Sequence, residues 1–383
     1  MASREYVQST RARYRSAGSR REKSALLDEL VLVTGYTRKH AIALMNADGR
    51  ARRGGGKRSG RPRAYRLCLP AVEVVWEALD YCCAERLHPQ LLPLAEALAR
   101  HGEIDLTREA RQELAGISRA TLARRLKEMP RGKPRLWVAK RHPSRLLSSQ
   151  VPVERYCWNE GRAGALEVDL VDHSGGLAGG HYAYTLSVVD VVSGWSRRRA
   201  VMGKSQAAVY EALAELLDEW PSGVWGLHSD NGSEFLSGHL IAYCQGHGIT
   251  FHRSRPYRKN DNAHVEQKNR QLVREVVGYD RIDTQAGLAW LNGVYEVLDP
   301  YANLILPNLK VIHKSRHGSA IRKRYDTAKT PLQRLQDLGA LLSQRAAELT
   351  RLQEQLNPLE IRRTLDRLQR QGPQDTPLAQ AAD

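Results

Sequence analysis

The sequence lacks a run of about eighteen apolar residues, the length that a membrane-spanning helix requires, and no apolar signal-peptide segment follows Met1. Cysteine is scarce: the five cysteines are scattered along the chain, and no C-x-x-C pair among them matches a zinc module. We therefore expect a protein of the bacterial cytoplasm with no membrane partner, whose cysteines stay reduced and structurally inert.

Acidic residues are outnumbered. The 383 residues include 59 Lys and Arg against 42 Asp and Glu, which gives a formal net charge of +17. A field of this sign attracts polyanions, and cations that meet phosphates release counterions. We therefore expect a nucleoid-associated protein whose partner is DNA. A chain of this length also predicts two or three domains, each with a core of its own.

Residues 1–48 are predicted to form a helix-turn-helix module that binds DNA. An apolar-periodic helix around residues 25–32 is followed by a break at 34–36 and by a second helix that opens at Thr37. Arg38, Lys39 and His40 would lie in the first turn of that helix, where a recognition helix meets bases and phosphates. The alternative is an ordinary helical hairpin with a solvated basic face.

Residues 49–69 are predicted to be a basic linker, since positions 49–66 hold eight Lys and Arg and no acid. Within it, Arg61 and Arg63 resemble the arginines of an arm that enters the minor groove, although a simple solvated linker is an open alternative. Residues 70–150 form a second predicted helical module. There, 107–129 repeats the helix-turn-helix pattern and places Arg119 and Arg124 on its second helix.

Residues 151–295 are predicted to form an α/β core with a mixed sheet. Positions 166–171 alternate in polarity, so that Glu167 and Asp169 share one face of a strand. The remaining elements are expected as strands at 182–192 and 195–202, a helix at 205–220, a strand at 224–228, a helix at 237–247 and a strand at 249–252. Three antiparallel strands followed by alternating helix and strand indicate an α/β layer.

Two further acids stand at a fixed spacing. Asp230 ends a predicted strand within Asp230-Asn231-Gly232, so its carboxylate would emerge at the carboxyl edge of the sheet, where ligands usually bind. Glu266 follows after thirty-five intervening residues, at the end of Asn262-x-x-x-Glu266. With an acid on the opening strand, this pattern resembles that of the DDE recombinases, the family of insertion-sequence transposases and retroviral integrases.

The resemblance covers residues 160–280, and segments 34–40 and 316–325 are similar to those of bacterial insertion-sequence transposases. No H-H-C-C zinc domain of the viral integrases stands at the front. The resemblance implies a multidomain protein with all-α N-terminal modules and a ribonuclease-H-like core. It also implies that Asp169, Asp230 and Glu266 are the catalytic and metal-binding residues.

The first acid involves a choice among Glu167, Asp169 and Asp172, which lie within six residues. Strand alternation places Glu167 and Asp169 on one face and Asp172 on the other. The family carries its first acid in the strand interior. We therefore choose Asp169, with Asp172 as the alternative.

Three carboxylates suit phosphoryl transfer because hard divalent cations take oxygen ligands and are not held by one acid alone. Two Mg²⁺ ions, with Mn²⁺ as substitute, would activate a nucleophile and stabilise the leaving 3′ oxygen. The resemblance implies cleavage at the 3′ ends of a transposon, followed by strand transfer into target DNA. The partners would be terminal inverted repeats, target DNA and further copies of the chain in a synaptic complex.

The residues around Glu266 are expected to contact DNA. Arg270 and Arg274 would share its helix face at four-residue steps, unless Arg270 merely forms a salt bridge with Glu266. The preceding loop resembles the segment with which the family contacts the DNA end. The residues of that loop are Tyr257, Arg258, Lys259 and Asn262.

Residues 296–335 are predicted to be a small basic β module that binds DNA without much sequence preference, and 336–383 a helix and a disordered tail. Leucines recur between Leu338 and Leu356 at four- and three-residue steps, before Asn357-Pro358 interrupts the run. They indicate a short coiled coil at best, or equally a helix that packs on its own chain.

Two other functions fit parts of the pattern. A DNA-binding regulator descended from such an enzyme would keep the helical modules and lose catalysis, but the three acids are intact. A ribonuclease-H-like nuclease would cut structured DNA or RNA without joining strands. Terminal inverted repeats beside the gene would distinguish the transposase from this nuclease.

Overall fold

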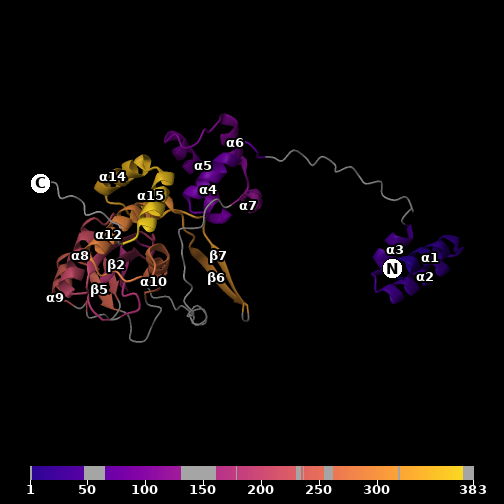
Figure 1. Cartoon of the computed structure of the whole chain (residues 1–383), viewed down its shortest axis with the longest axis horizontal. Helices are drawn as coiled ribbons and strands as arrows, with labels where there is room; N and C mark the ends of the chain where they lie inside the picture. The colour runs from indigo at the N-terminus through magenta and orange to yellow at the C-terminus, as the bar shows by residue number, and fades with distance from the viewer. Residues whose placement is uncertain are drawn as a thin grey trace. The chain divides into compact units, whose positions relative to one another are not determined.

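The computed structural model describes residues 2–46, 65–130, 161–177, 179–229, 234–235, 237–253, 262–317 and 320–373 (Figure 1). The chain divides into two compact units, Met1–Ala64 and Tyr65–Asp383. No helix among the described residues is long and apolar enough to cross a membrane.

The first unit contains three helices, α1 (Ala2–Ser16), α2 (Arg20–Thr34) and α3 (Arg38–Asn46). Ser19 begins α2 with a capping box: its side chain accepts from the Glu22 backbone N–H, while the Glu22 carboxylate accepts from the Ser19 N–H. Gly35 ends α2 in the left-handed region at φ 70°, which a glycine adopts without strain. The helices α2 and α3 and the turn between them thus lie where the sequence predicts them, whereas α1 was not predicted. DNA binding by this unit stays a prediction.

The second unit begins with four helices, α4 (Leu69–Ala78), α5 (Ala84–Arg100), α6 (Arg108–Gly116) and α7 (Arg119–Glu128). Thr107 caps α6 by accepting from the Ala110 N–H, and Ser118 caps α7 by accepting from the Thr121 N–H. The Ser118 cap begins α7 directly after the short turn at Ile117, which is buried.

A five-stranded sheet forms the centre of the second unit. Its strands are β1 (Ala165–Asp172), β2 (Ala183–Asp190), β3 (Ser196–Met202), β4 (Gly226–Ser229) and β5 (Thr250–Arg253). Their order is β3-β2-β1-β4-β5. The first three strands are antiparallel, whereas β4 is parallel to β1 and β5 is parallel to β4. This mixed sheet has the expected ribonuclease-H-like arrangement, and the predicted fold class is confirmed.

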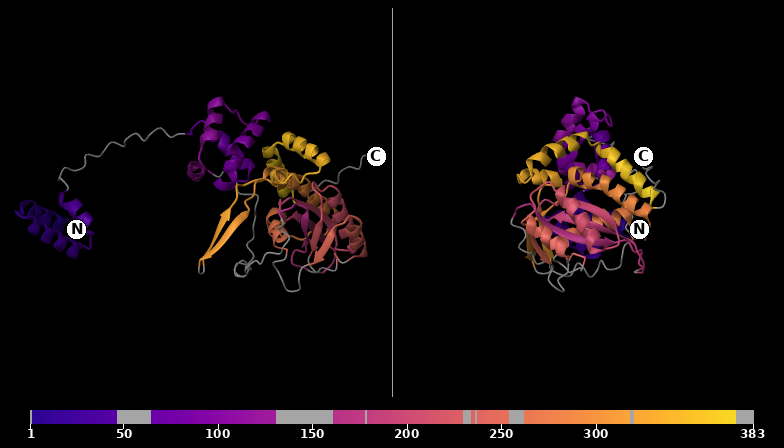
Figure 2. Two further views of the ribbon diagram at one scale, coloured as in Figure 1. Left: turned by 180° about the vertical axis from the view of Figure 1, so that it is seen from behind. Right: turned by 90° about the vertical axis from the view of Figure 1, so that its left-hand side faces the viewer.

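Helices pack around the sheet (Figure 2). They are α8 (Gln206–Asp218), α9 (Gly238–Gly246), α10 (Ala263–Lys268), the π-helix η2 (Asn269–Arg274), α11 (Glu275–Val277), α12 (Gln285–Pro300) and the π-helix η3 (Tyr301–Ile305). A buried ion pair fixes α12 to β3: Asp299 accepts from the Arg198 backbone N–H at 2.8 Å and from its Nε at 2.7 Å. Since breaking a buried pair leaves an uncompensated charge, this contact holds the sheet and α12 in one arrangement.

The C-terminal part comprises a two-stranded sheet, β6 (Val311–His317) and β7 (Ala320–Tyr325), followed by α13 (Pro331–Asp337), α14 (Ser343–Gln355) and α15 (Pro358–Gln371). Of the two alternatives for the leucines of 338–356, the structure shows a helix that packs on its own chain: Leu349 and Leu352 of α14, and Leu356 just after it, contact the core of the second unit. Leu338 and Leu342 are exposed and lie between α13 and α14. The residues after 373 lie outside the described chain.

Candidate functional site

Asp169 lies in the middle of β1, opposite Ser187 of β2. Its Oδ2 accepts a hydrogen bond of 2.8 Å from Nδ2 of Asn269, the first residue of η2. Its Oδ1 accepts from the backbone N–H of Leu170 at 2.9 Å. The carboxylate is therefore held toward the segment that carries Glu266.

Glu167 occupies the same face of β1, two residues earlier, and only 6% of its surface is exposed. Its Oε2 accepts from the backbone N–H groups of His264 (2.8 Å) and Val265 (2.9 Å) in the first turn of α10. Asn262, the residue at the N-cap, makes no side-chain cap of its own. A carboxylate from the central strand thus replaces the usual local cap.

Burial raises the pKa of Glu167 to about 7, although the two backbone hydrogen bonds oppose this shift. The charges of Glu266 and Asp169 raise it further. The charges of both carboxylates thus act on Glu167.

Glu266 lies on α10, its side chain is exposed, and its backbone N–H donates to the Asn262 carbonyl at 3.0 Å. The helix that carries it is held at two points, by Glu167 at its first turn and by the Asn269–Asp169 bond just after its end. The short helix that carries Glu266 is thus fixed by hydrogen bonds to the strand that carries Asp169.

Asp172, the alternative first acid, lies at the end of β1 and has partners of its own. Its Oδ1 accepts from the side chain of Ser174 at 2.8 Å, and Arg274 approaches its Oδ2 at 3.5 Å. Burial raises its pKa, but the Ser174 hydrogen bonds and the Arg274 charge outweigh burial and hold the pKa below its ordinary value. Asp172 is therefore a carboxylate whose charge is compensated by Arg274.

The second predicted acid, Asp230, lies outside the described residues, as do Tyr257, Arg258, Lys259, Arg61 and Arg63. Strand β4 ends at Ser229, immediately before Asp230, and the parallel register pairs His228 of β4 with Glu167 of β1. Among the described residues, no three acidic, His or Cys side chains are grouped closely enough to hold a metal ion.

The helix after Glu266 departs from the expected periodicity, because residues 269–274 are π-helical. Four-residue steps do not preserve a helix face through such a segment. Arg270 pairs with Glu275 at 3.4 Å, while Arg274 reaches Asp172 and lies over the ring of Tyr279. The expectation that both arginines share the face of Glu266 on α-helical spacing is therefore wrong in its geometry, and their contact with DNA stays a prediction.

The predicted DNA-binding residues of the helical modules are at the surface. Arg38 pairs with Asp28 and donates to Ser24 of α2, and the ring of His40 meets that of Tyr36 edge-on at 4.9 Å. Lys39, Arg119 and Arg124 are exposed.

Two residues with structural roles at the site, Glu167 and Asn269, were not among the predicted site residues. The alternation of β1 already placed Glu167 on the face of Asp169. Asn269 follows Glu266 by three residues, and this spacing places two side chains on one side of a helix. Their partners lie about a hundred residues away, so no local pattern could identify the bonds.

Comparisons with known proteins give matches to a family model, a related protein and a solved structure. Residues 160–259 match the integrase core domain family. The chain is 36% identical over 346 residues to the uncharacterized protein y4rM of Sinorhizobium fredii, and the match covers 87% of this chain and 95% of that protein. A solved structure, the catalytic core domain of BIV integrase, matches at 22% identity with a TM-score of 0.24. That match covers 28% of this chain and 66% of the other, just under two thirds. The chain belongs to the same family as the rhizobial protein, and its central domain is an integrase core of the transposase and integrase type.

Proposed function

We propose that this protein is a DNA transposase that cleaves 3′ ends of its own element and joins them to target DNA. The observation that carries the proposal is that Glu167 and Asn269 fix α10, which carries Glu266, to the face of β1 that carries Asp169. Like charges that are brought together in a fold favour a cation beside them.

The donor set fits hard divalent ions. Asp169 has a carboxylate fixed in place by Asn269 and Leu170, and Glu266 presents an exposed one from α10. We assign these two acids, with Asp230, as ligands of two Mg²⁺ ions, for which Mn²⁺ can substitute. Asp230 is assigned as a ligand because of its Asp-Asn-Gly motif and its spacing to Glu266. When bound, the ions would polarise the scissile phosphate and stabilise the oxygens that attack and leave.

The reaction has two steps. In the first, a water oxygen attacks the phosphorus at the element's end, and the bond between phosphorus and the 3′ oxygen breaks. That oxygen takes a proton and becomes a 3′-hydroxyl, while the phosphate stays on the flanking strand. In the second step this hydroxyl attacks a phosphodiester of target DNA and displaces another 3′ oxygen. One phosphodiester bond forms as one breaks, so no external energy source is required.

The chain's own residues position the reacting groups. Glu167 holds the first turn of α10, and Asn269 holds Asp169, so the two catalytic carboxylates keep their places when DNA arrives. We propose Arg270, Arg274, Asn262 and the loop residues Tyr257, Arg258 and Lys259 as contacts to the DNA end. Arg38, Lys39, His40, Arg61, Arg63, Arg119 and Arg124 would bind the terminal repeat.

The test uses the full chain and duplex DNA copied from the sequences that flank its gene. With Mg²⁺ or Mn²⁺ we expect nicks that leave a 3′-hydroxyl and then joined products with a second duplex, and neither product in EDTA. Asp230→Ala and Glu266→Gln should remove both products, whereas Arg351→Gln on the exposed surface of α14 should retain them. Nicks without joined products would instead indicate a nuclease, and no metal-dependent product would refute the proposal.

A further inference from the structure

The ribbon formed by β6 and β7 is exposed wherever the exposure of its side chains is described, except at Ser315, which is half-buried. Ile312 and Ile321 are each 51% exposed and Tyr325 is 48% exposed. In Figures 1 and 2 the ribbon extends away from the elements beside its root. The small β module predicted for 296–335 is thus a two-stranded sheet. A two-stranded ribbon of this kind is marginally stable on its own in water.

The ribbon carries charges of a single sign. No acid occurs between residues 300 and 325, whereas Lys314, Arg316, Arg322, Lys323 and Arg324 all lie within the ribbon. The register sets Lys314 directly opposite Lys323 and His313 opposite Arg324. Like charges in directly opposed positions destabilise a β pair, so this sequence is poorly suited to an isolated hairpin.

The two faces of the ribbon are both basic. Opposed residues share a face and neighbours along a strand alternate. Lys314 and Lys323 therefore project from one face, while Arg322 and Arg324 project from the other. A flat acidic surface could meet only one of these faces.

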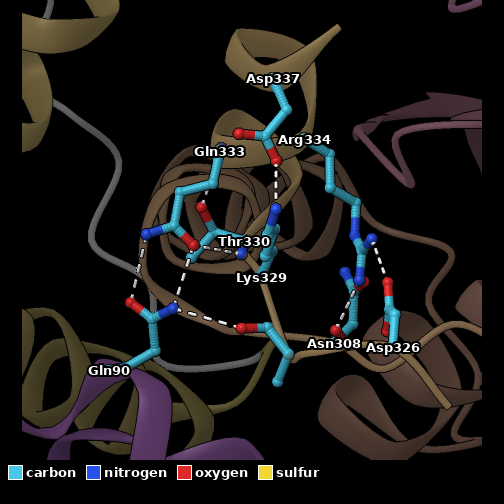
Figure 3. A network of polar contacts seen from close by, with 9 residues as sticks. Gln90, Asn308, Asp326, Lys329, Thr330, Gln333, Arg334 and Asp337 are labelled. Carbon is cyan, nitrogen blue, oxygen red and sulfur yellow. Dashed lines mark hydrogen bonds and ion pairs between the residues drawn. The ribbon is translucent and has the colours of Figure 1, made fainter.

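The root of the ribbon, in contrast, is firmly fixed. The Lys310 N–H donates to Asp326 at 2.7 Å, and the Asp326 N–H donates back to the Lys310 carbonyl at 2.9 Å. Asp326 also pairs with Arg334 at 2.6 Å, and Arg334 donates to the Asn308 carbonyl (Figure 3). Lys310 Nζ reaches the Val191 carbonyl after β2 at 3.0 Å. The fold thus anchors the root of the positively charged ribbon to the core.

We propose that the β6–β7 ribbon lies in the major groove of the duplex DNA on which the protein acts. That groove admits a two-stranded ribbon, and phosphates line both of its walls, so the cations of both faces find partners at once. Those phosphates relieve the repulsion between the strands. The inference rests on DNA as the substrate of the proposed function, and it adds a surface that acts apart from the catalytic acids.

The experiment measures binding of the full chain to a 30-base-pair duplex in EDTA, which prevents catalysis, over a series of salt concentrations. The variant replaces three cations of β7: Arg322→Gln, Lys323→Gln and Arg324→Gln. A matched control replaces three exposed arginines of α14 and α15: Arg351→Gln, Arg367→Gln and Arg370→Gln. Neither set includes the anchoring residues of the ribbon root.

We expect the ribbon variant to bind DNA on the order of a hundredfold more weakly. The slope of its plot of log K against log salt should be smaller in magnitude by about two to three, because each lost phosphate contact removes about 0.9 from that slope. The control should keep most of the wild-type slope. Glucosylated cytosines in the duplex, which fill the major groove, should weaken DNA binding by the wild-type protein more than DNA binding by the ribbon variant. An unchanged slope, or a loss equal to that of the control, overturns the proposal.

A changed oligomeric state with unchanged DNA binding would also overturn the proposal, by showing that the ribbon meets a second copy of the chain. Failure of the ribbon proposal can be distinguished from failure of the proposed function. Cleavage and joining that survive unchanged in the ribbon variant would leave the catalytic assignment intact while the ribbon proposal failed.

Discussion

The side-chain amide of Asn269 donates a 2.8 Å hydrogen bond to Oδ2 of Asp169, across a hundred residues of sequence. This bond joins the central strand β1 to the helical segment that carries Glu266. The Glu167 carboxylate joins the same two elements from the other end of α10. The proposed catalytic carboxylates are thus positioned by two direct links between strand and helix.

The first prediction concerns which acid of β1 is catalytic. Asp169→Asn should reduce cleavage by at least about a hundredfold, because a neutral amide is a poor ligand for a divalent ion. Asp172→Asn should keep activity within a fewfold, because Asp172 is already compensated by Ser174 and Arg274. Single-turnover cleavage of an end-labelled duplex measures both. Loss of activity in the Asp172 variant alone would move the catalytic position three residues along β1.

The second prediction concerns Asn269. Asn269→Ala removes the donor that orients Asp169, so the apparent affinity for Mg²⁺ should fall about 10- to 100-fold, as is typical when a partner of a metal ligand is lost. Saturating metal should restore most of the maximal rate. Gln271→Ala, an exposed neighbour in the same π-helix, is the matched control. A lower maximal rate with unchanged metal dependence would argue against this role.

The third prediction concerns the cap on α10. Glu167→Ala leaves the His264 and Val265 N–H groups without their acceptor and should cost about 1–3 kcal/mol of unfolding free energy. Glu167→Gln keeps a carbonyl oxygen there and should remain closer to the wild type in stability and in activity. Chemical denaturation and amide exchange at residues 264 and 265 provide the readouts. Glu211→Ala, an exposed glutamate on α8, controls for loss of a surface charge. Equal stability of the Ala and Gln variants would exclude the capping role.

The sheet could be predicted because strand-forming runs and turns are local features of the sequence, and β1 was found within two residues of its bounds. Asp169 could be preferred to Asp172 because alternation is a local property. The contacts of Glu167 and Asn269 could not be predicted in this way, since they depend on where α10 lies against β1. The π-helical turn after Lys268 was also not predicted, and so the direction in which Arg274 points was not predicted either. The leucine spacing over 338–356 did not indicate the break between α13 and α14, because the same spacing also fits one continuous ideal helix.

The fourth prediction concerns acid stability. His173 is fully buried, and its Nε2 lies 2.7 Å from Oγ1 of Thr185, which in turn bonds to Tyr295. Burial, aided by the Arg274 charge and opposed by Asp172, lowers the pKa of His173 from 6.5 to about 3. Between those values the unfolded chain binds a proton that the folded chain does not, so stability must fall as the pH drops below 6.5.

The expected slope from this histidine approaches about 1.4 kcal/mol per pH unit below pH 6.5, and it vanishes above that pH. Urea denaturation at pH 7.5, 6.0 and 5.0 measures it. His173→Gln keeps a polar side chain without the titration, so its stability should fall less over the same interval. Parallel pH profiles for the two proteins would show that His173 does not stay neutral in the fold.

The most direct test of the proposed metal-binding acids is a change of metal preference. Asp169→Cys and Glu266→Cys each replace a carboxylate by a thiolate, which Mn²⁺ accepts more readily than Mg²⁺ does. In the 3′-cleavage assay we predict that both variants are inactive with Mg²⁺ and recover activity with Mn²⁺, while Asp172→Cys works with either ion. Equal activity of the Asp169 and Glu266 variants in both metals would contradict the claim that these carboxylates hold the catalytic ions.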